Sequence, residues 1–178
     1  MTMDIDAVRR QWAREIPEAN LSGLAMALRL TRIGKLMDLH FSAYCREAHG
    51  LRSQDMRVLL ALHRSGTPYA LRPTDLFRSL LVTSGAITKQ VDRLSERGLV
   101  RRTPDSDHGG GWLVQLTPAG LKVADTTIRH HCFEPSISLA LAELLQSYEA
   151  NKRKQVESFM IDVLRVVEEI AGGLAPRK

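Results

Sequence analysis

One short segment in the middle of the chain carries side chains that suit nucleic-acid chemistry. Lys89 and Arg93 hold cationic donors that can contact guanine edges or phosphates, and Thr88 and Gln90 can reach a base edge or a phosphate. Ser84 stands where the backbone amides of a helix N-terminus favour a phosphate. The types and spacing of these residues predict a helix surface that contacts DNA.

The opposite side of the same segment is apolar. By packing, this side is expected to hold the polar side chains in position. Apolar residues recur there at steps of three and four, which predicts a helix from about 84 to 97. These residues are Ile87, Val91 and Leu94. Thr83 or Ser84 can cap the N-terminus of this helix, and Gly98 follows it as a C′ glycine does. One face is therefore expected to pack and the other to meet DNA.

The segments on either side of this helix are predicted to form another helix and two strands. Pro73 suits the first turn of a helix, which we expect from about 73 to 80. Residues 99–103 and 112–116 read as strands, and the loop PDSDHGGG between them is too polar for a core. Two helices followed by a glycine-rich hairpin predict a winged helix-turn-helix. The fold class is thus mainly α with a small β-hairpin wing (α+β).

Helices are expected on both sides of this motif. We predict helices over about 4–15, 22–48, from a Ser53 cap to Gly66, from Thr117–Pro118 to about 145 with a kink at Pro135, and 148–170. In the third of these, the residues predicted to face inward are Met56, Leu59, Leu60 and His63. Each long helix has a continuous row of apolar side chains along one face, and this face is expected to pack against another surface.

Composition limits the classes of protein that this chain can be. A length of 178 residues with 44% hydrophobic residues favours one compact domain, and the net charge of +5 suits phosphate contacts. No apolar run approaches the length of a membrane span, and the N-terminus lacks a signal-peptide core, so we expect a soluble, cytoplasmic protein. Two cysteines, Cys45 and Cys132, are read as free thiols.

Enzyme sites are not supported by the spacing of reactive residues. His130 and His131 are adjacent and point to different sides of a helix, so a metal site there is not expected. The glycines at 109–111 lack the lysine and the strand-to-helix setting of a phosphate loop. We therefore expect no enzyme activity, no cofactor and no metal.

Three stretches make the chain resemble the MarR family of bacterial transcription regulators. They are LRSQDMRVLLAL, TSGAITKQVDRLSERGLVRR and the wing that closes with LVQLTPAG. The resemblance implies a homodimer that binds a palindromic double-stranded DNA operator, with repression as the family default and release by a small molecule. It implies one domain over 1–178, in which 51–117 form the DNA-binding region and 1–50 with 118–178 the helical dimerisation region.

The resemblance also implies which residues contact DNA. The predicted contacts are Thr74, Thr83, Ser84, Ala86, Thr88, Lys89, Gln90, Arg93, His108, Gly109 and Gly110. For Arg93, a salt bridge with Glu96 or Glu47 is a rival role. The wing departs from the family, because Gly110 stands where an arginine usually enters the minor groove, and either His108 substitutes for it or the loop is a plain connection.

A second resemblance concerns the effector. The N-terminal segment VRRQWAREIPEANLSGL is similar to the MarR branch that includes urate-responsive repressors, in which a tryptophan, an aspartate and arginines surround an anionic purine. Arg57 stands where that branch has its aspartate and Gln90 where it has one arginine, which implies a related pocket for another planar anion. The candidate lining is Trp12, His40, Tyr44, Arg57 and Arg102.

Two other functions stay open at this point. One is a thiol-based redox-sensing regulator, in which a reactive cysteine replaces the small-molecule effector. The other is a winged helix that binds protein instead of DNA.

Overall fold

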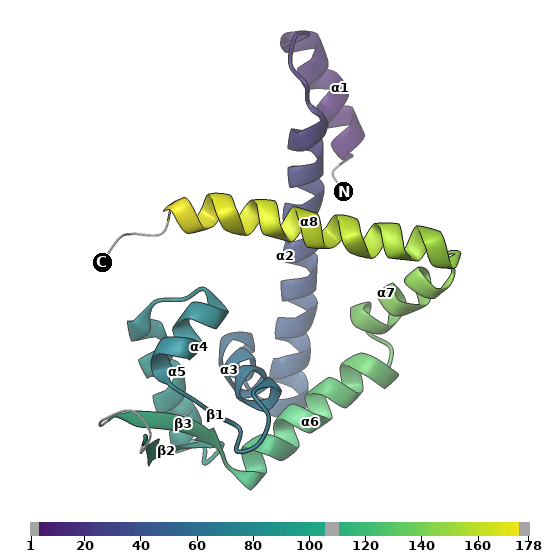
Figure 1. Ribbon diagram of the computed structural model, residues 1–178. Helices are drawn as coiled ribbons and strands as arrows, with labels where there is room; N and C mark the ends of the chain where they lie inside the picture. Colours follow the sequence, from purple (N-terminus) through teal and green to yellow (C-terminus); the bar gives the residue numbers. More distant parts are fainter. Residues whose placement is uncertain (1–3, 106–110, 175–178) are drawn as a thin grey trace. The chain divides into compact units, whose positions relative to one another are not determined.

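The computed structural model describes residues 4–105 and 111–174. The chain folds into two compact units, Met1–Thr127 and Ile128–Lys178 (Figure 1). The first unit contains α1 (Ile5–Glu15), α2 (Ser22–His49), α3 (Ser53–Arg64), β1 (Ala70–Leu71), α4 (Pro73–Leu80), α5 (Ser84–Glu96), β2 (Val100–Pro104), β3 (Trp112–Leu116) and most of α6 (Pro118–Phe133). The rest of α6, α7 (Ile137–Gln146) and α8 (Ala150–Leu174) belong to the second unit. The predicted fold class, mainly helical with a small wing, is confirmed.

The strands form a three-stranded antiparallel sheet in the order β1-β3-β2. Val114 pairs with Leu71 on one side and with Arg102 on the other, so β3 is the central strand. The sequence predicted β2 within one residue and β3 at its observed bounds, but it did not predict β1. Two residues are too few to show an alternating pattern in the sequence. They form a strand because they pair with β3.

The core of the first unit lies where α3, α4 and α5 meet the sheet. Its largest fully buried side chains are Met56, Leu59, Leu62, Leu76, Ile87, Leu94, Val58, Val91 and Val114. Met56 and Leu59 face inward as predicted, whereas Leu60 and His63 are only partly buried. Burial of such side chains contributes about 1.5 to 3 kcal/mol each, so this cluster holds the winged motif together.

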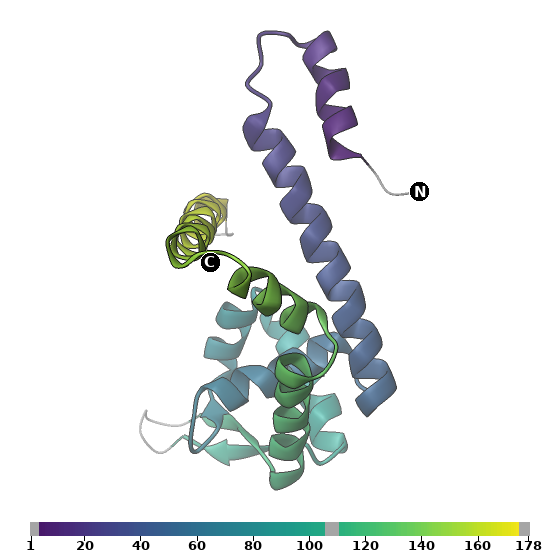
Figure 2. The ribbon, with the colours of Figure 1, turned by 90° about the vertical axis from the view of Figure 1, so that its right-hand side faces the viewer.

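The first helix folds back along the long second one. In two views at right angles, α1 runs antiparallel to the N-terminal part of α2 (Figures 1 and 2). Asp4 caps α1 by accepting hydrogen bonds from the backbone of Asp6 and Ala7, and Asp6 forms an ion pair of 2.6 Å with Arg29 of α2. Both ion-pair partners are exposed, so the pair aligns the helices more than it stabilises them.

The ends of two helices test the capping predictions. Thr83 caps α5, because its hydroxyl accepts a hydrogen bond of 3.3 Å from the backbone N–H of Ala86, and Gly98 has a left-handed φ of 66°. The predicted Ser53 cap is wrong: the N-cap of α3 is Arg52, which makes no side-chain capping bond. The Ser53 hydroxyl instead lies 2.8 Å from that of Ser42, which joins α3 to α2.

The helix expected to continue through Pro135 is interrupted there. α6 ends at Phe133, and α7 begins after Ser136, whose hydroxyl accepts a hydrogen bond of 3.1 Å from the backbone N–H of Leu139. Proline lacks the N–H that a continuous helix would need, and a serine cap then starts the next helix. The prediction of one kinked helix is therefore corrected to two helices.

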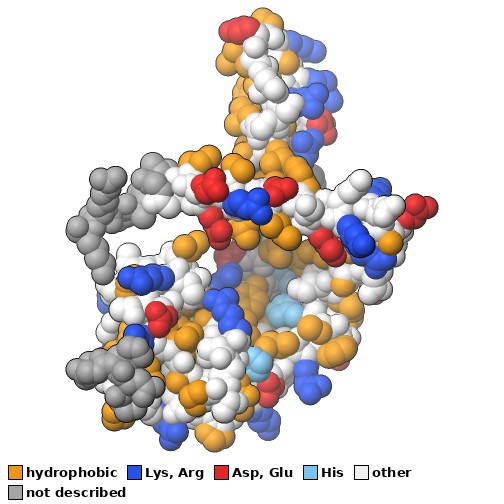
Figure 3. All heavy atoms as spheres, viewed as in Figure 1, with side chains coloured by type: hydrophobic (Ala, Val, Ile, Leu, Met, Phe, Trp, Pro, Cys, Tyr) orange, Lys and Arg blue, Asp and Glu red, His pale blue; other side chains and the backbone are white. Residues whose placement is uncertain are grey.

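The second unit exposes many apolar side chains. Hydrophobic side chains flank a band of charged ones along α8 (Figure 3). Those of α8 that are about half exposed or more are Phe159, Met160, Ile161, Leu164, Val166, Val167 and Ile170. A helix with this much exposed apolar surface is expected to pack against another surface. None of the described helices has the length and apolar character of a membrane span.

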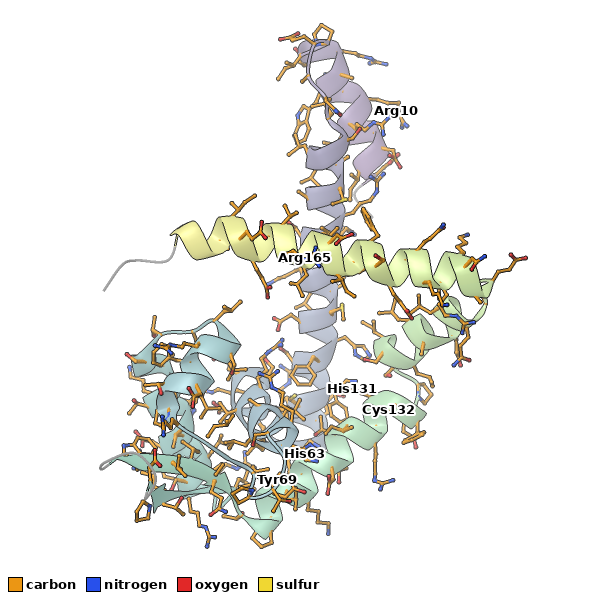
Figure 4. The ribbon with its side chains drawn as sticks, viewed as in Figure 1. Arg10, His63, Tyr69, His131, Cys132 and Arg165 are labelled. Atoms are coloured by element: carbon orange, nitrogen blue, oxygen red, sulfur yellow. The ribbon has the colours of Figure 1, made fainter. Side chains whose placement is uncertain are left out.

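Two non-glycine residues of the winged motif have left-handed backbone conformations. Tyr69 has a φ of 58°, and its ring stacks on His63 at 5.8 Å between centroids (Figure 4). The same histidine lies 2.8 Å from Asp125 of α6. Leu81, in the turn between α4 and α5, has a φ of 54° and a side chain that is 91% exposed.

Candidate nucleic-acid interface

The N-terminal half of α5 presents an exposed polar surface. The apolar side of the whole helix is fully buried against the core, because Ile87 in this half and Val91 and Leu94 in the second half are each 0% exposed. On the other side Ser84, Thr88 and Lys89 are exposed. A helix anchored on one face can thus offer the opposite face to a groove.

The start of α4 and the cap of α5 add further polar groups. Thr74 and Thr83 are exposed, and Ala86 is half-buried. The hydroxyl of Thr88 donates a hydrogen bond of 3.2 Å to the backbone oxygen of Ser84, which leaves its lone pairs available. In the described part of the chain, no ion pair or hydrogen bond engages Lys89. Its ammonium group is the cation of α5 that remains available to a phosphate or a base.

Gln90 lies on the buried side of the helix. It is 5% exposed, and its Oε1 atom has no hydrogen-bond partner among the described residues. A side chain in this position cannot reach a DNA groove without leaving the core. We therefore leave Gln90 out of the surface that we assign to DNA.

Arg93 is half-buried and is paired with an acidic residue of α3. Its Nε donates to Asp55 at 3.1 Å and its Nη2 donates to the other carboxylate oxygen at 2.5 Å. The Asp55 side chain is only 5% exposed. The hydrogen bonds that Arg93 donates to the Asp55 carboxylate raise the pKa of Arg93. The partner is neither Glu96 nor Glu47, and sequence reasoning missed Asp55 because it lies 38 residues away.

The remaining arginines of this region also have protein partners. Arg97 donates to the backbone oxygens of Gly50 and His49. Arg101 donates to Gln115 at 3.0 Å. Arg102 forms an ion pair with Asp92 and its guanidinium lies 4.6 Å from the centre of the Trp112 ring. Of these three arginines, Arg102 is ion-paired, while Arg97 and Arg101 donate to uncharged oxygens.

The base of the wing is tied to the start of α4. Arg72, which precedes Pro73, donates from Nε to Asp105 at 2.7 Å, and the Asp105 side chain is 10% exposed. The backbone N–H of Asp105 donates to the oxygen of Gly111 at 3.2 Å, which closes the hairpin. Sequence reasoning missed this pair. The candidate contacts His108, Gly109 and Gly110 lie outside the described residues.

The five candidate effector residues do not form one site within a single chain. His40 and Tyr44 lie one turn apart on α2, whereas Arg57 of α3 contacts two other residues of α2, with an ion pair of 2.7 Å to Asp38 and its guanidinium 5.1 Å from the centre of the Phe41 ring. Trp12 is half-buried on α1, and Arg102 lies on β2. The structure therefore does not bring the five together.

An open hollow lies elsewhere, between the end of α2 and the start of α3. It has a volume of about 380 Å³. Its lining is Ser42, Arg46, Gly50, Leu51, Arg52, Ser53 and Gln54. None of the candidate effector residues borders it. Within the described residues, no group of three or more His, Cys, Asp or Glu side chains is arranged to hold a metal ion.

The two cysteines differ in environment. Cys45 is fully buried, and this burial raises the pKa of its thiol to about 11. Cys132 is exposed. A thiol with so high a pKa is almost entirely protonated at neutral pH and is a poor nucleophile. Cys45 therefore does not have the properties of a redox sensor.

Comparison with known proteins places the winged motif in context. The MarR family model matches residues 49–109. The chain is 24% identical over 129 residues to the HTH-type transcriptional regulator PecS of Dickeya dadantii, which covers 72% of this chain and 77% of PecS. It is 31% identical over 75 residues to the multiple antibiotic resistance protein MarR of Salmonella typhimurium, covering 42% of this chain and 50% of that protein.

Solved structures share the fold. A mutant of MarR from E. coli complexed with operator DNA superimposes with a TM-score of 0.59 at 22% identity, over 83% of this chain and 99% of that one. The match to the family model and the likeness to this solved structure support the winged-helix fold of the chain. PecS is named as a transcriptional regulator and not as an enzyme, and the MarR mutant was solved with operator DNA.

Proposed function

We propose that this chain, as a MarR-type winged-helix regulator, binds a palindromic operator as a homodimer through the N-terminal half of α5. The observation that carries this proposal is the two-sided character of that helix half. Its buried side holds Ile87, which is 0% exposed, whereas Ser84, Thr88 and Lys89 are exposed and Lys89 has no partner in the described part of the chain. The likeness to a MarR protein that was solved with operator DNA supports DNA as the ligand.

The DNA-contacting set follows from these exposures. We assign contacts to Thr74, Thr83, Ser84, Ala86, Thr88 and Lys89, with the wing residues His108, Gly109 and Gly110 retained from the sequence. Arg93 moves from this set to a positioning role, because its guanidinium already makes two bonds to Asp55. A cation in a buried ion pair would have to give up that pair before it could bind a phosphate.

The homodimer is supported by the uncovered apolar faces. α8 exposes seven large hydrophobic side chains, and α2 exposes Ile33, Leu36, Met37 and Leu39. A second copy of the chain offers the same apolar faces, so two-fold pairing can cover both at once. Pairing also supplies two copies of α5, which palindromic half-sites require.

We further propose that a small anionic aromatic effector releases the operator, so that the chain represses in its absence. Support comes from the part of α2 that carries His40 and Tyr44, where the Arg57 guanidinium of α3 lies 5.1 Å from the centre of the Phe41 ring. An arginine beside an aromatic ring suits a planar anion, which would compete with the exposed Asp38 carboxylate for the Arg57 guanidinium. The urate-responsive branch remains a resemblance, since Arg57 replaces its aspartate.

Selection of duplexes from a random-sequence library tests the proposal, with sedimentation of the free chain alongside. We expect enrichment of an inverted repeat whose half-sites lie about one helical turn apart, and a dimer in solution. A monomer that enriches no sequence would contradict the proposal. Displacement of the enriched duplex by urate, salicylate and benzoate then compares effectors of related charge and shape.

The alternative of a redox sensor makes a different prediction. A thiol reagent should modify one cysteine of the native chain, the exposed Cys132, and two in denaturant. If Cys45 were instead modified in the native state at neutral pH, the redox function would be favoured over a small-molecule effector.

A further inference from the structure

The end of α2 is built around backbone oxygens that need donors. The last turn of any α-helix leaves carbonyl groups without intrahelical partners. Gly50 takes a left-handed φ of 60° there, and its N–H donates to the oxygen of Arg46 at 3.0 Å. Leu51 donates to the oxygen of Cys45, also at 3.0 Å. The oxygens of His49 and Gly50 lie beyond these two bonds.

Arg97 satisfies those two oxygens. Its Nη1 donates to the oxygen of Gly50 at 2.7 Å and its Nη2 donates to that of His49 at 3.0 Å. A cation at a helix C-terminus is also favoured by the helix dipole. Arg97 is the C-cap residue of α5, so one guanidinium connects the ends of the recognition helix and of α2.

A second arginine supports the same arrangement one turn earlier. Arg93 bonds in two places to Asp55 in the first turn of α3. Positions four residues apart lie on one side of a helix, so Arg93 and Arg97 hold one side of α5 against α3 and the end of α2. The orientation of Thr88 and Lys89, at the other end of α5, depends on these anchors.

We infer that Arg97 is a positioning residue that couples α2 to the recognition helix and makes no contact with DNA. This inference rests on the proposed function. Both of its terminal nitrogens are engaged by backbone oxygens, so we expect its exposed guanidinium to act on the end of α2 and not on a phosphate. A shift of α2, the helix that carries His40 and Tyr44, would be transmitted through Arg97 to the base-reading end of α5.

Salt dependence separates a positioning arginine from a phosphate contact. The probes are a duplex enriched from a random-sequence library by the wild-type chain and a scrambled duplex of the same composition. For Arg97→Met we expect about a tenfold loss of affinity for the enriched duplex. Affinity for the scrambled duplex and the salt slope should stay unchanged, since no phosphate contact is lost. Lys89→Met is the matched control, and its slope should fall by about 0.9 per subunit.

Arg97→Lys provides the rescue, because an ammonium group can donate to one or both backbone oxygens and should restore part of the lost selectivity. Stoichiometric titration gives the active fraction of each variant, so misfolded protein is not counted as weak binding. The inference is overturned if Arg97→Met weakens both duplexes equally with a reduced slope, or if it leaves the affinity for the enriched duplex intact. Failure of the wild-type chain to enrich any duplex would instead overturn the proposed function.

Discussion

The two halves of α5 contain similar residue types but use them differently. In the first half, Ser84, Thr88 and Lys89 are exposed. In the second half Arg93 is bonded to Asp55, while Arg97, just beyond the helix, is bonded to the end of α2. We therefore propose that the first half recognises DNA and that the second half positions the first.

The largest expected effect comes from removing the anchor of the second half. Asp55→Ala leaves Arg93 without its partner and should lower the free energy of unfolding by about 3 kcal/mol, the lower end for breaking a buried ion pair. The loss should fall at the lower end of the range for buried ion pairs because the Arg93 side chain is 32% exposed. Urea denaturation followed by circular dichroism measures the change.

An exposed pair of the same chemistry is the control. Arg57→Ala removes the ion pair with Asp38, whose side chains are 47% and 50% exposed, and should cost less than about 1 kcal/mol. Equal losses for the two variants would mean that burial does not distinguish these pairs.

The second half of α5 can also be disturbed by displacing Leu99, which lies in the segment after the helix. A Cβ atom at Gly120 would lie 2.0 Å from the backbone oxygen of Leu99, so Gly120→Ala must move one backbone away from the other. Leu99 donates to the oxygen of Leu94 at the end of α5. We expect a loss of about 2 kcal/mol, typical of an overpacked core, measured by thermal unfolding. Gly85→Ala meets nothing within 4 Å, and because alanine is the better helix former, the melting temperature should stay level or rise.

The recognition half should respond in binding and not in stability. Lys89→Ala removes an exposed cation with no partner in the described part of the chain, so operator affinity should fall by about 1 to 3 kcal/mol while the unfolding midpoint stays within error. Gel-shift titration and sedimentation give affinity and dimerisation. Unchanged affinity would show that the first half does not read DNA, and a lost dimer would give Lys89 a structural role.

The smallest effect is expected at the cap that begins the recognition half. Thr83→Ala removes the acceptor for the Ala86 N–H and should cost about 1 kcal/mol of stability, whereas Thr83→Gly should cost only a few tenths. Chemical denaturation of both variants resolves the difference. If the two variants were equally unstable, the hydroxyl would act through something other than capping.

Local sequence patterns predicted most of the helices and strands. The periodicity of Ile87, Val91 and Leu94 predicted α5 and its buried face, and alternation predicted β3. β1 was missed because it depends on a strand more than 40 residues away, as the pairing of Leu71 with Val114 shows. Short elements of this kind exist through tertiary pairing, and no local signal specifies them.

The site was harder to predict than the fold for a related reason. Gln90 was placed among the DNA contacts by its residue type, although the helix turns it toward the core. The partners of Arg93 and Arg97 lie 38 and more residues away in sequence, so spacing could not identify them. Helix periodicity gives the direction of a side chain only approximately at the edge of an apolar face.

The turn between α4 and α5 shows that this sequence is not at its optimum of stability. Leu81 takes a left-handed backbone conformation, which costs a non-glycine residue about 1 kcal/mol, and its 91% exposed side chain gains almost no burial in return. Glycine or asparagine at this position would relieve the strain, and natural proteins commonly retain such unused stabilising substitutions. Stability of the single chain therefore does not explain a leucine here, and a more heat-resistant variant is one substitution away.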